Sequence, residues 1–256
     1  MSNSPLVSYT KLSPNHSGKR KHSIDRISPH CIVAQWSVDN IGNWFAKKST
    51  QASCNYGIAK DGKVALIVDE GNRSWCTSSG ENDNRAVTIE CASDSTHPYA
   101  FNNTVYNKLI DLCADICKRN GKNKLIWISD KNKALSYNPK SNEMLLTVHR
   151  WFKNKACPGD WLMKRMDDLT KKVNKKLSSS SDTTSSKSTK KSYKVKPTTD
   201  NLNIRKGPGT NYNKVGKLSM DKTYTIVEES SGSGTSKWGK LKSGKGWVSL
   251  DFVTKV

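Results

Sequence analysis

Ala86-Val-Thr-Ile-Glu-Cys91 is the stretch that decides the fold of the longer part of this chain. Its apolar and polar residues alternate, which predicts a β-strand, because successive side chains of a strand point to opposite faces of a sheet. One face carries Val87, Ile89 and Cys91, and the other carries Ala86, Thr88 and Glu90.

Further strands and a long helix are expected on either side of this stretch. Tyr56–Ile58 and Val64–Val68 flank the turn Lys60–Lys63, which is a hairpin signal. Residues 104–120 repeat apolar side chains at helical spacing, and Gly121 stands where a C-terminal cap belongs. Other expected elements are a buried strand Cys31–Gln35, a strand Leu125–Ile128 and a closing helix Trp161–Val173. Strands mixed with helices predict an α/β domain with a central mixed sheet flanked by helices.

A polar segment separates this part from a shorter one. Residues 176–193 are rich in Ser, Thr and Lys, and Leu177 is followed by no apolar residue until Tyr193. Such a segment cannot bury a core, so it predicts a flexible linker extended by its charge. Residues 1–175 and 194–256 are then two domains of ordinary size.

Charge and cysteine content limit the classes of function. The formal net charge is +21 at pH 7, which favours a polyanionic partner such as nucleic acid, anionic lipid or a bacterial wall. Nucleic acid and membrane insertion are not expected, because we find no nucleic-acid-binding motif and no apolar run that would span a membrane. The seven cysteines are odd in number and scattered, which favours reduced thiols over a disulfide framework.

The segment His149–Asp160 is the strongest candidate for catalytic chemistry. It offers an imidazole at His149 and a thiol at Cys157, on a loop stiffened by Pro158. A catalytic zinc ion needs about three protein ligands and an open position for water. Taken alone, however, a satisfied histidine and an ordinary core cysteine explain the pair equally well.

This segment resembles the C-terminal zinc motif of the type 2 N-acetylmuramoyl-L-alanine amidases, a family that includes phage amidase lysozymes and is related to peptidoglycan recognition proteins. Lys155-Ala-Cys157-Pro-Gly159 fits the Lys-x-Cys-Pro form of that motif. The other landmarks, in the order of the family, are the first-ligand strand start at Ser28–Ala34, the hairpin at Asn55–Gly62, the cleft segment Arg73–Trp75 and the strand Asn84–Glu90. The first of these lacks the threonine that usually follows the family's first histidine.

The resemblance implies a zinc-dependent hydrolase that cuts the amide between N-acetylmuramic acid and L-alanine. The implied zinc ligands are His30, His149 and Cys157. Lys155 is placed to stabilise the negative charge of the tetrahedral oxyanion, although a solvated surface lysine is the alternative for this position.

The proton-transfer residue departs from one pattern within the family. Some members use a catalytic tyrosine where this chain has Cys54, and Tyr56 aligns with a packing aromatic instead. Members without that tyrosine carry a glutamate at the position of Glu90, so general base and acid work is assigned to Glu90. An exposed strand glutamate is the alternative interpretation.

The shorter part also carries a recognisable pattern. Short β-rich runs separated by Gly, Ser and Asn turns predict a small all-β barrel. Leu202–Tyr212 resembles the opening of bacterial SH3-type (SH3b) domains, and Lys245–Val253 resembles their ending. The resemblance implies binding to the cell wall, and the candidate contacts are Arg205, Tyr212, Trp238 and Trp247. Trp247 as a core residue remains an alternative.

Together, the two resemblances imply a phage endolysin, monomeric in solution, that digests the peptidoglycan of a Gram-positive host. Met1–Pro5 does not begin a secretory signal peptide, so the protein is expected to be made in the host cytoplasm and to act on the wall after release. The alternatives are a bacterial autolysin of the same activity and a peptidoglycan-binding protein that does not cut. The presence of Cys157 argues against the last alternative, because relatives that only bind lack this cysteine.

Overall fold

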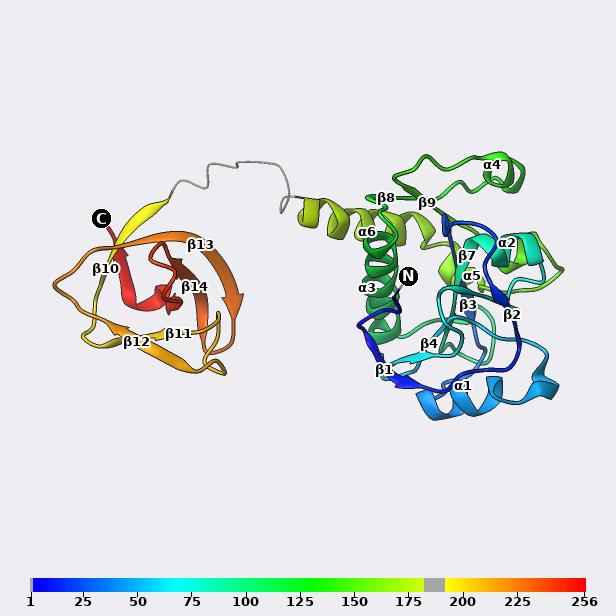
Figure 1. The fold of residues 1–256 in the computed structure, drawn as a ribbon, viewed down its shortest axis with the longest axis horizontal. Helices are drawn as coiled ribbons and strands as arrows, with labels where there is room; N and C mark the ends of the chain where they lie inside the picture. The colour runs from blue at the N-terminus through cyan, green and yellow to red at the C-terminus, as the bar shows by residue number, and fades with distance from the viewer. Residues whose placement is uncertain (1, 182–191) are drawn as a thin grey trace. The chain divides into compact units, whose positions relative to one another are not determined.

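The computed structural model describes residues 2–181 and 192–256. The chain divides into two compact units, Met1–Ser185 and Ser186–Val256 (Figure 1). Helix α6 (Met166–Ser181) continues past residue 176, where the predicted linker begins, because Leu177 is buried in the core together with Val173. Residues 182–191 of that predicted linker lie outside the described residues.

The larger unit is built on a seven-stranded mixed sheet. Its strands, in order across the sheet, are β1 (Val7–Thr10), β5 (Val64–Leu66), β4 (Tyr56–Ile58), β7 (Ala86–Cys91), β3 (Arg26–Cys31), β9 (Glu143–Leu146) and β8 (Lys124–Ile126). Neighbouring strands are parallel except β4 and β5, which form the predicted antiparallel hairpin. Two further short strands, β2 (His16–Lys19) and β6 (Asn72–Ser74), pair with each other.

Helices cover this sheet. They are α1 (Val38–Phe45), α2 (Gly80–Arg85), α3 (Asn103–Arg119), α4 (Lys131–Ser136), α5 (Asp160–Met163) and α6, with 3-10 turns η1 (Lys48–Thr50) and η2 (His149–Trp151). The alternation of side chains along β5 shows that both faces are covered: Val64 and Leu66 pack in the core that contains α3, whereas Ala65 packs in the core that contains α1. α3 is the predicted amphipathic helix, and Gly121 follows it with a positive φ of 68°. α3 and α6 pack against each other (Figure 1).

Two predicted elements differ from the structure. The strand expected over Cys31–Gln35 lies earlier, because β3 ends at Cys31, so His30 is at the end of its strand and not at the start. Ser28 and His30 interrupt the apolar pattern of β3, which hid the strand from a search for apolar runs. The helix expected over Trp161–Val173 is two helices, α5 and α6, separated by a turn that the N–H of Arg165 closes on the carbonyl of Leu162.

The smaller unit is a second, all-antiparallel sheet of seven strands. Their order is β12 (Lys214–Leu218), β11 (Leu202–Arg205), β15 (Trp247–Ser249), β14 (Thr235–Leu241), β13 (Tyr224–Gly232), β10 (Tyr193–Pro197) and β16 (Val253–Lys255), with the 3-10 turn η3 (Leu250–Phe252) before the last. Its core is aliphatic and comprises Val195, Leu202, Ile204, Leu218, Ile226, Leu241 and Val248. This is the all-β, SH3-type domain predicted from the sequence.

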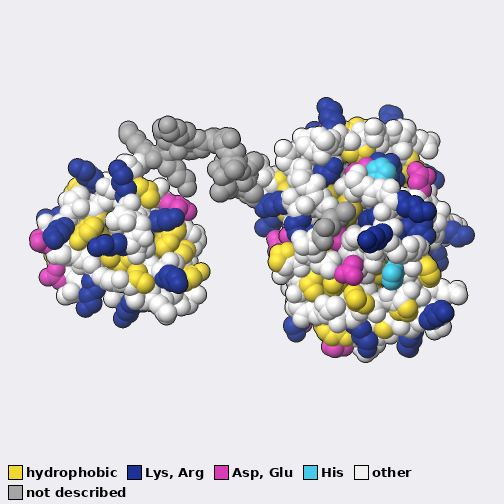
Figure 2. Space-filling view, in the orientation of Figure 1, with side chains coloured by type: hydrophobic (Ala, Val, Ile, Leu, Met, Phe, Trp, Pro, Cys, Tyr) yellow, Lys and Arg dark blue, Asp and Glu magenta, His cyan; other side chains and the backbone are white. Residues whose placement is uncertain are grey.

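The surface of both units is basic. Figure 2 shows Lys and Arg side chains scattered over the visible face of each unit, in keeping with the net charge of +21. Among the described residues, no helix combines the length and the hydropathy needed to cross a membrane.

Candidate metal centre

The site lies on the polar face of β3 and β7. These strands are parallel neighbours, and their register sets His30 beside Glu90. Ile27 and Ile89 pack in the α3 core. Because side chains alternate along a strand, His30 and Glu90 point to the opposite face of the sheet. The fold therefore places an imidazole beside a carboxylate at the ends of two neighbouring strands.

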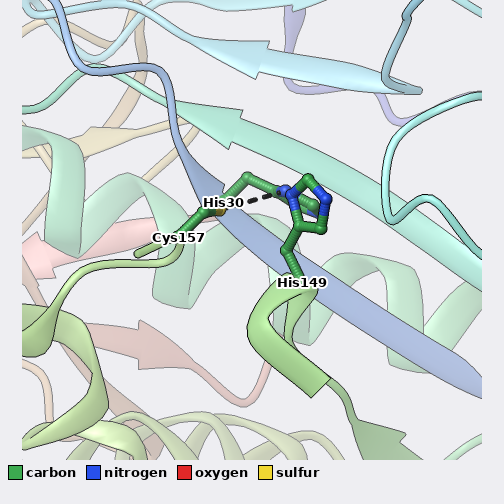
Figure 3. Close-up of side chains that lie close together, drawn as sticks. All are labelled: His30, His149 and Cys157. Atoms are coloured by element: carbon green, nitrogen blue, oxygen red, sulfur yellow. Dashed lines mark hydrogen bonds between the residues drawn. The ribbon is translucent and has the colours of Figure 1, made fainter. Parts of the chain in front are cut away.

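The segment that follows β9 brings two further donors over this face. β9 pairs with β3. Two residues separate the end of β9 from η2, which begins with His149. Cys157 Sγ lies 3.2 Å from His30 Nδ1, and the ring centroids of His30 and His149 are 5.0 Å apart (Figure 3). One ligand atom from each of the three lies within 4.8 Å of the others. The structure thus brings together the three residues expected to bind a metal ion.

Three hydrogen bonds hold His149 and the Cys157 loop in this arrangement. Ser78 Oγ is 3.1 Å from His149 Nε2, so the orientation of this ring is tied to the loop before α2. The backbone N–H of Arg150 donates to the carbonyl of Cys157 at 3.1 Å, and its guanidinium donates to Asp160 Oδ1 at 2.9 Å. Such supporting contacts fix ligand orientation in metal sites.

The donor set suits zinc. Two imidazole nitrogens and one thiolate make up a three-ligand catalytic set that leaves a position open. Burial, and then the charge of His149, lowers the pKa of His30 well below its usual value; burial, and then the charge of Lys155, lowers the pKa of His149. Both rings are therefore neutral at pH 7, the form that binds a metal. His30 Nε2 is buried without a hydrogen-bond partner among the described residues, so this imidazole is not a satisfied core histidine.

Glu90 stands directly beside these donors. Its Oε1 is 3.9 Å from His30 Nδ1 and 3.8 Å from Cys76 Sγ. Its Oε2 is buried and has no hydrogen-bond partner within the described parts of the chain. Burial raises the pKa of Glu90 to about 7, and the hydrogen bond from Cys76 opposes this shift. With a side chain that is 15% exposed, Glu90 is not the solvated strand residue of the alternative interpretation.

An open cleft of about 430 Å³ borders the site at His149. Its lining comprises Gln51, Ala52, Arg73, Ser74, Trp75, Cys76, Ser78, Ser79, Gly80, Asp83, His149 and Lys155. Lys155 is exposed on the cleft wall, close enough to His149 for its charge to lower the pKa of that ring. Trp75, in the segment expected to line the cleft, is 39% exposed, and its Nε1 donates to Ser17 Oγ at 2.6 Å. A bulky substrate thus has access to the site from the side of His149.

Two side chains at the site, Cys76 and Ser78, escaped prediction from the sequence. Both lie within three residues after the segment Arg73–Trp75, so the position of that segment was the available signal. Tyr56, in contrast, is fully buried, and its hydroxyl donates to Glu70 Oε2 at 2.6 Å. This contact agrees with the packing role expected for Tyr56.

The candidate wall contacts of the barrel lie in unlike environments. Tyr212 is 43% exposed, and Trp247 is half-buried on β15, in register with Arg205 on β11. Arg205 Nη1 donates to the carbonyls of Thr210 and Tyr212, both at 2.8 Å, so this guanidinium braces its own loop. Trp238 is only 3% exposed. At this exposure the ring of Trp238 offers little surface to a wall ligand, and the contact expected of it stays a prediction.

Comparisons with known proteins cover both units. Residues 19–160 match the family described as N-acetylmuramoyl-L-alanine amidase, and residues 200–254 match the bacterial SH3 domain. The chain is similar in structure to N-acetylmuramoyl-L-alanine amidase LysC from Clostridium intestinale (14% identity, 66% of this chain, 99% of that chain, TM-score 0.45). It is also similar to Staphylococcus aureus hydrolase AmiA in complex with its ligand (14% identity, 68% of this chain, 84% of that chain, TM-score 0.48). A third similar structure is that of PlyL (16% identity, 64% of this chain, 95% of that chain, TM-score 0.45). No curated protein sequence matches the chain.

Proposed function

The chain belongs to the N-acetylmuramoyl-L-alanine amidase family and carries a bacterial SH3 domain, and we propose that it is a zinc-dependent endolysin that lyses a Gram-positive host. Family membership makes it a peptidoglycan amidase with a wall-binding domain. The proposed bond is the amide between N-acetylmuramic acid and L-alanine. The observation that carries the zinc dependence is the convergence of His30, His149 and Cys157 within 4.8 Å.

We further propose that the protein is made in the cytoplasm of a phage-infected cell and acts, as a monomer, on the wall after release. The net charge of +21 supports the choice of substrate, because a basic surface concentrates the protein on an anionic Gram-positive wall. The seven cysteines are all free thiols, which suits synthesis in a reducing compartment.

His30, His149 and Cys157 would hold the ion. Bound there, zinc supplies Lewis acidity, which polarises the amide carbonyl and makes water a nucleophile at neutral pH. The chain's own part is to keep the two rings neutral through burial and to fix the thiol by the hydrogen bond between the N–H of Arg150 and the carbonyl of Cys157.

Glu90 is the residue proposed to move protons. Its Oε2 has no other hydrogen-bond partner among the described residues, so it is available to accept the proton of the attacking water. The same atom then returns the proton to the leaving nitrogen of L-alanine, since a group that titrates near neutral pH can act first as a base and then as an acid. A pKa of about 7 gives Glu90 this property.

Lys155 is proposed to stabilise the charge that develops during attack. When water adds to the amide carbon, negative charge forms on the carbonyl oxygen, and a cation on the cleft wall lowers the energy of that state. The lining of the cleft contains both Lys155 and His149, so the ammonium group borders the position that a substrate occupies.

Digestion of purified Gram-positive walls tests the proposal. The full chain should release free amino groups without releasing reducing sugars. Cys157→Ser should abolish this release but leave wall binding intact, because the barrel is unchanged. The matched control is Cys117→Ser, a thiol on α3 at the other face of the sheet, which should retain activity. Reducing ends among the products, or retained digestion by Cys157→Ser, would contradict the proposal.

A further inference from the structure

We infer that His30, Cys76 and Glu90 form a second metal-binding set, which competes with the first set for the imidazole of His30. One ligand atom from each of these residues lies within 4.8 Å of the other two. Only His30 belongs to both sets. The inference goes beyond the proposed function, because an ion in the second set would engage the carboxylate that proton transfer requires.

The backbone holds all three residues of the second set in place. His30 and Glu90 are paired residues of adjacent parallel strands. Cys76 follows β6, and its backbone N–H donates to Asp83 Oδ2 at 2.9 Å. The N–H of the next residue, Thr77, donates to the same carboxylate. Cys76 is therefore fixed relative to α2, the helix that leads directly into β7, and is not a thiol on a free loop.

Two of the three distances in the second set are close to those that zinc requires. Tetrahedral zinc with bonds of about 2.0 to 2.3 Å to N, O and S holds its ligand atoms about 3.3 to 3.7 Å apart. Glu90 Oε1 is 3.9 Å from His30 Nδ1 and 3.8 Å from Cys76 Sγ. Small side-chain rotations would therefore close the set around an ion. In the first set, Cys157 Sγ and His30 Nδ1 are 3.2 Å apart, so these two atoms would have to move slightly apart to bind the same ion.

Charge balance favours the second set in a buried site. A thiolate and a carboxylate neutralise a divalent ion, whereas the first set offers one thiolate and leaves a net positive charge. Burying an uncompensated charge is costly, and both His30 and Glu90 Oε2 are buried, so a neutral cluster is favoured on this inner side of the cleft. Glu90 Oε2, which has no hydrogen-bond partner in the described chain, adds a further free lone pair on this side. Thiolate and carboxylate together suit zinc and its thiophilic relative cadmium.

Cys157 Sγ and Glu90 Oε1 both approach Nδ1 of His30, and one nitrogen binds one ion, so the two sets exclude each other. An ion held by His149 and Cys157 leaves Glu90 free to move protons. An ion held by Cys76 and Glu90 occupies the carboxylate, so Glu90 can no longer accept a proton and the site is inactive. The second set is thus an inactive, metal-bound form of the same site.

Cobalt(II) binding to the full chain tests this inference, because a thiolate bound to cobalt gives a strong ultraviolet charge-transfer band. With Cys157→Ser, cobalt should still produce that band through Cys76. The double variant Cys157→Ser/Cys76→Ser should lose it. A matched control is Cys157→Ser/Cys54→Ser, which removes another buried thiol near Glu90 and should keep the band. Absence of the band in folded Cys157→Ser, or its persistence in the double variant with Cys76→Ser, would overturn the inference.

Alkylation of the unaltered protein gives a second measurement that needs no variant. Cobalt should slow the reaction of iodoacetamide with Cys76 as well as with Cys157, as read by peptide mass mapping. Protection of Cys157 alone would contradict metal binding by the second set but would agree with the proposed zinc site. Protection of neither thiol would contradict both, so failure of the inference and failure of the proposed function are distinguishable.

Discussion

His30 and Glu90 show how burial, more than residue type, prepares this site. Removing water disfavours the charged form of any group, so it lowers the pKa of an imidazole and raises that of a carboxyl. His30 is shifted down and Glu90 is shifted up to about 7, in each case mainly by burial. The proposed ligand His30 is therefore deprotonated, and the proposed proton carrier Glu90 titrates near neutral pH. Titratable groups pushed in opposite directions within one cleft are typical of functional sites.

At the scale of the residue, Glu90→Gln should lower wall digestion by about 10²- to 10⁴-fold, because the amide cannot accept a proton from water. Zinc content should stay unchanged, since the first metal-binding set does not include Glu90. Glu81→Gln, a change at an exposed glutamate on α2, is the control and should leave activity intact. Rates are measured as amino groups released per unit time. A Glu90→Gln protein with more than a tenth of the normal rate would rule out this role.

Zinc affinity should depend on pH through Cys157. Burial raises the pKa of this thiol well above its usual value, so the metal-free protein keeps it protonated at neutral pH. The pKa values of His30 and His149 are lowered, so these rings have no proton to lose. Binding therefore releases about one proton, and affinity should rise about tenfold per unit between roughly pH 7.5 and 8.5. Competition with a chelator across this range measures the slope, and a flat profile would contradict the prediction.

The sequence predicted much of the site but not all of it. His149, Cys157 and Lys155 lie in one short stretch, which singled it out as a candidate, but the local pattern alone did not assign their roles. The roles of these three residues, like those of His30 and Glu90 on separate strands, followed only from the family resemblance. Cys76 and Ser78 were missed because their contacts, with Glu90 and His149, join residues that are far apart in the sequence. The low exposure of Trp238 was not foreseen, because residue type alone does not distinguish a buried tryptophan in a barrel from an exposed one.

At the scale of the element, the register of β3 against β7 creates the site. Parallel neighbours whose side chains alternate set His30 and Glu90 on one face, away from the α3 core. The hairpin of β4 and β5, the strand β7 and the helix α3 were all predicted, since each has a clear apolar period. β3 was displaced by several residues in the prediction because its functional side chains break that period. The polar residues that make the site are thus the same ones that conceal its strand.

The C-terminal end of α3 is fixed by an ion pair, which yields a stability prediction. Glu70 is 1% exposed, and it accepts from Arg119 Nη2 at 2.7 Å and from Tyr56 Oη at 2.6 Å. Arg119→Met would leave the buried carboxylate without its cation, at a cost of about 3–5 kcal/mol in the free energy of unfolding. The control is Lys118→Met, an exposed neighbour on the same helix, with an expected change within about 0.5 kcal/mol. Urea unfolding of the larger unit measures both, and equal midpoints for the two variants would contradict the prediction.

At the scale of the whole molecule, the chain joins a cutting unit to a binding unit. The division at Ser185 agrees with two domains, yet the sequence placed the end of the first near residue 175. The difference arises because Lys, Ser and Asn dominate the second half of α6, whereas Leu177 still packs in the core. The polar composition of this stretch therefore predicted a linker, although the stretch is helical and buries Leu177.

Removal of residues 186–256 should separate the two activities. Hydrolysis of a soluble muramyl peptide should be unchanged, whereas digestion of intact walls should fall by at least about tenfold, because the barrel raises the effective concentration of the enzyme at its substrate. Adsorption of the full chain to walls should also weaken as salt rises, since its basic surface is screened. Pelleting assays with and without salt measure adsorption. A truncated chain that digests walls at the full rate would show that the barrel is not an anchor.

The most direct test of the central claim is metal analysis combined with mass analysis of the wall digest from the same sample. About one zinc ion per chain should be present, and the products should be stem peptides that begin with a free L-alanine beside intact glycan strands. A chelator should stop the reaction and added zinc should restore it, whereas Cys157→Ser should show neither activity nor recovery. The same products from zinc-free protein, or cleavage within the glycan, would contradict a zinc centre at His30, His149 and Cys157 as the source of the activity.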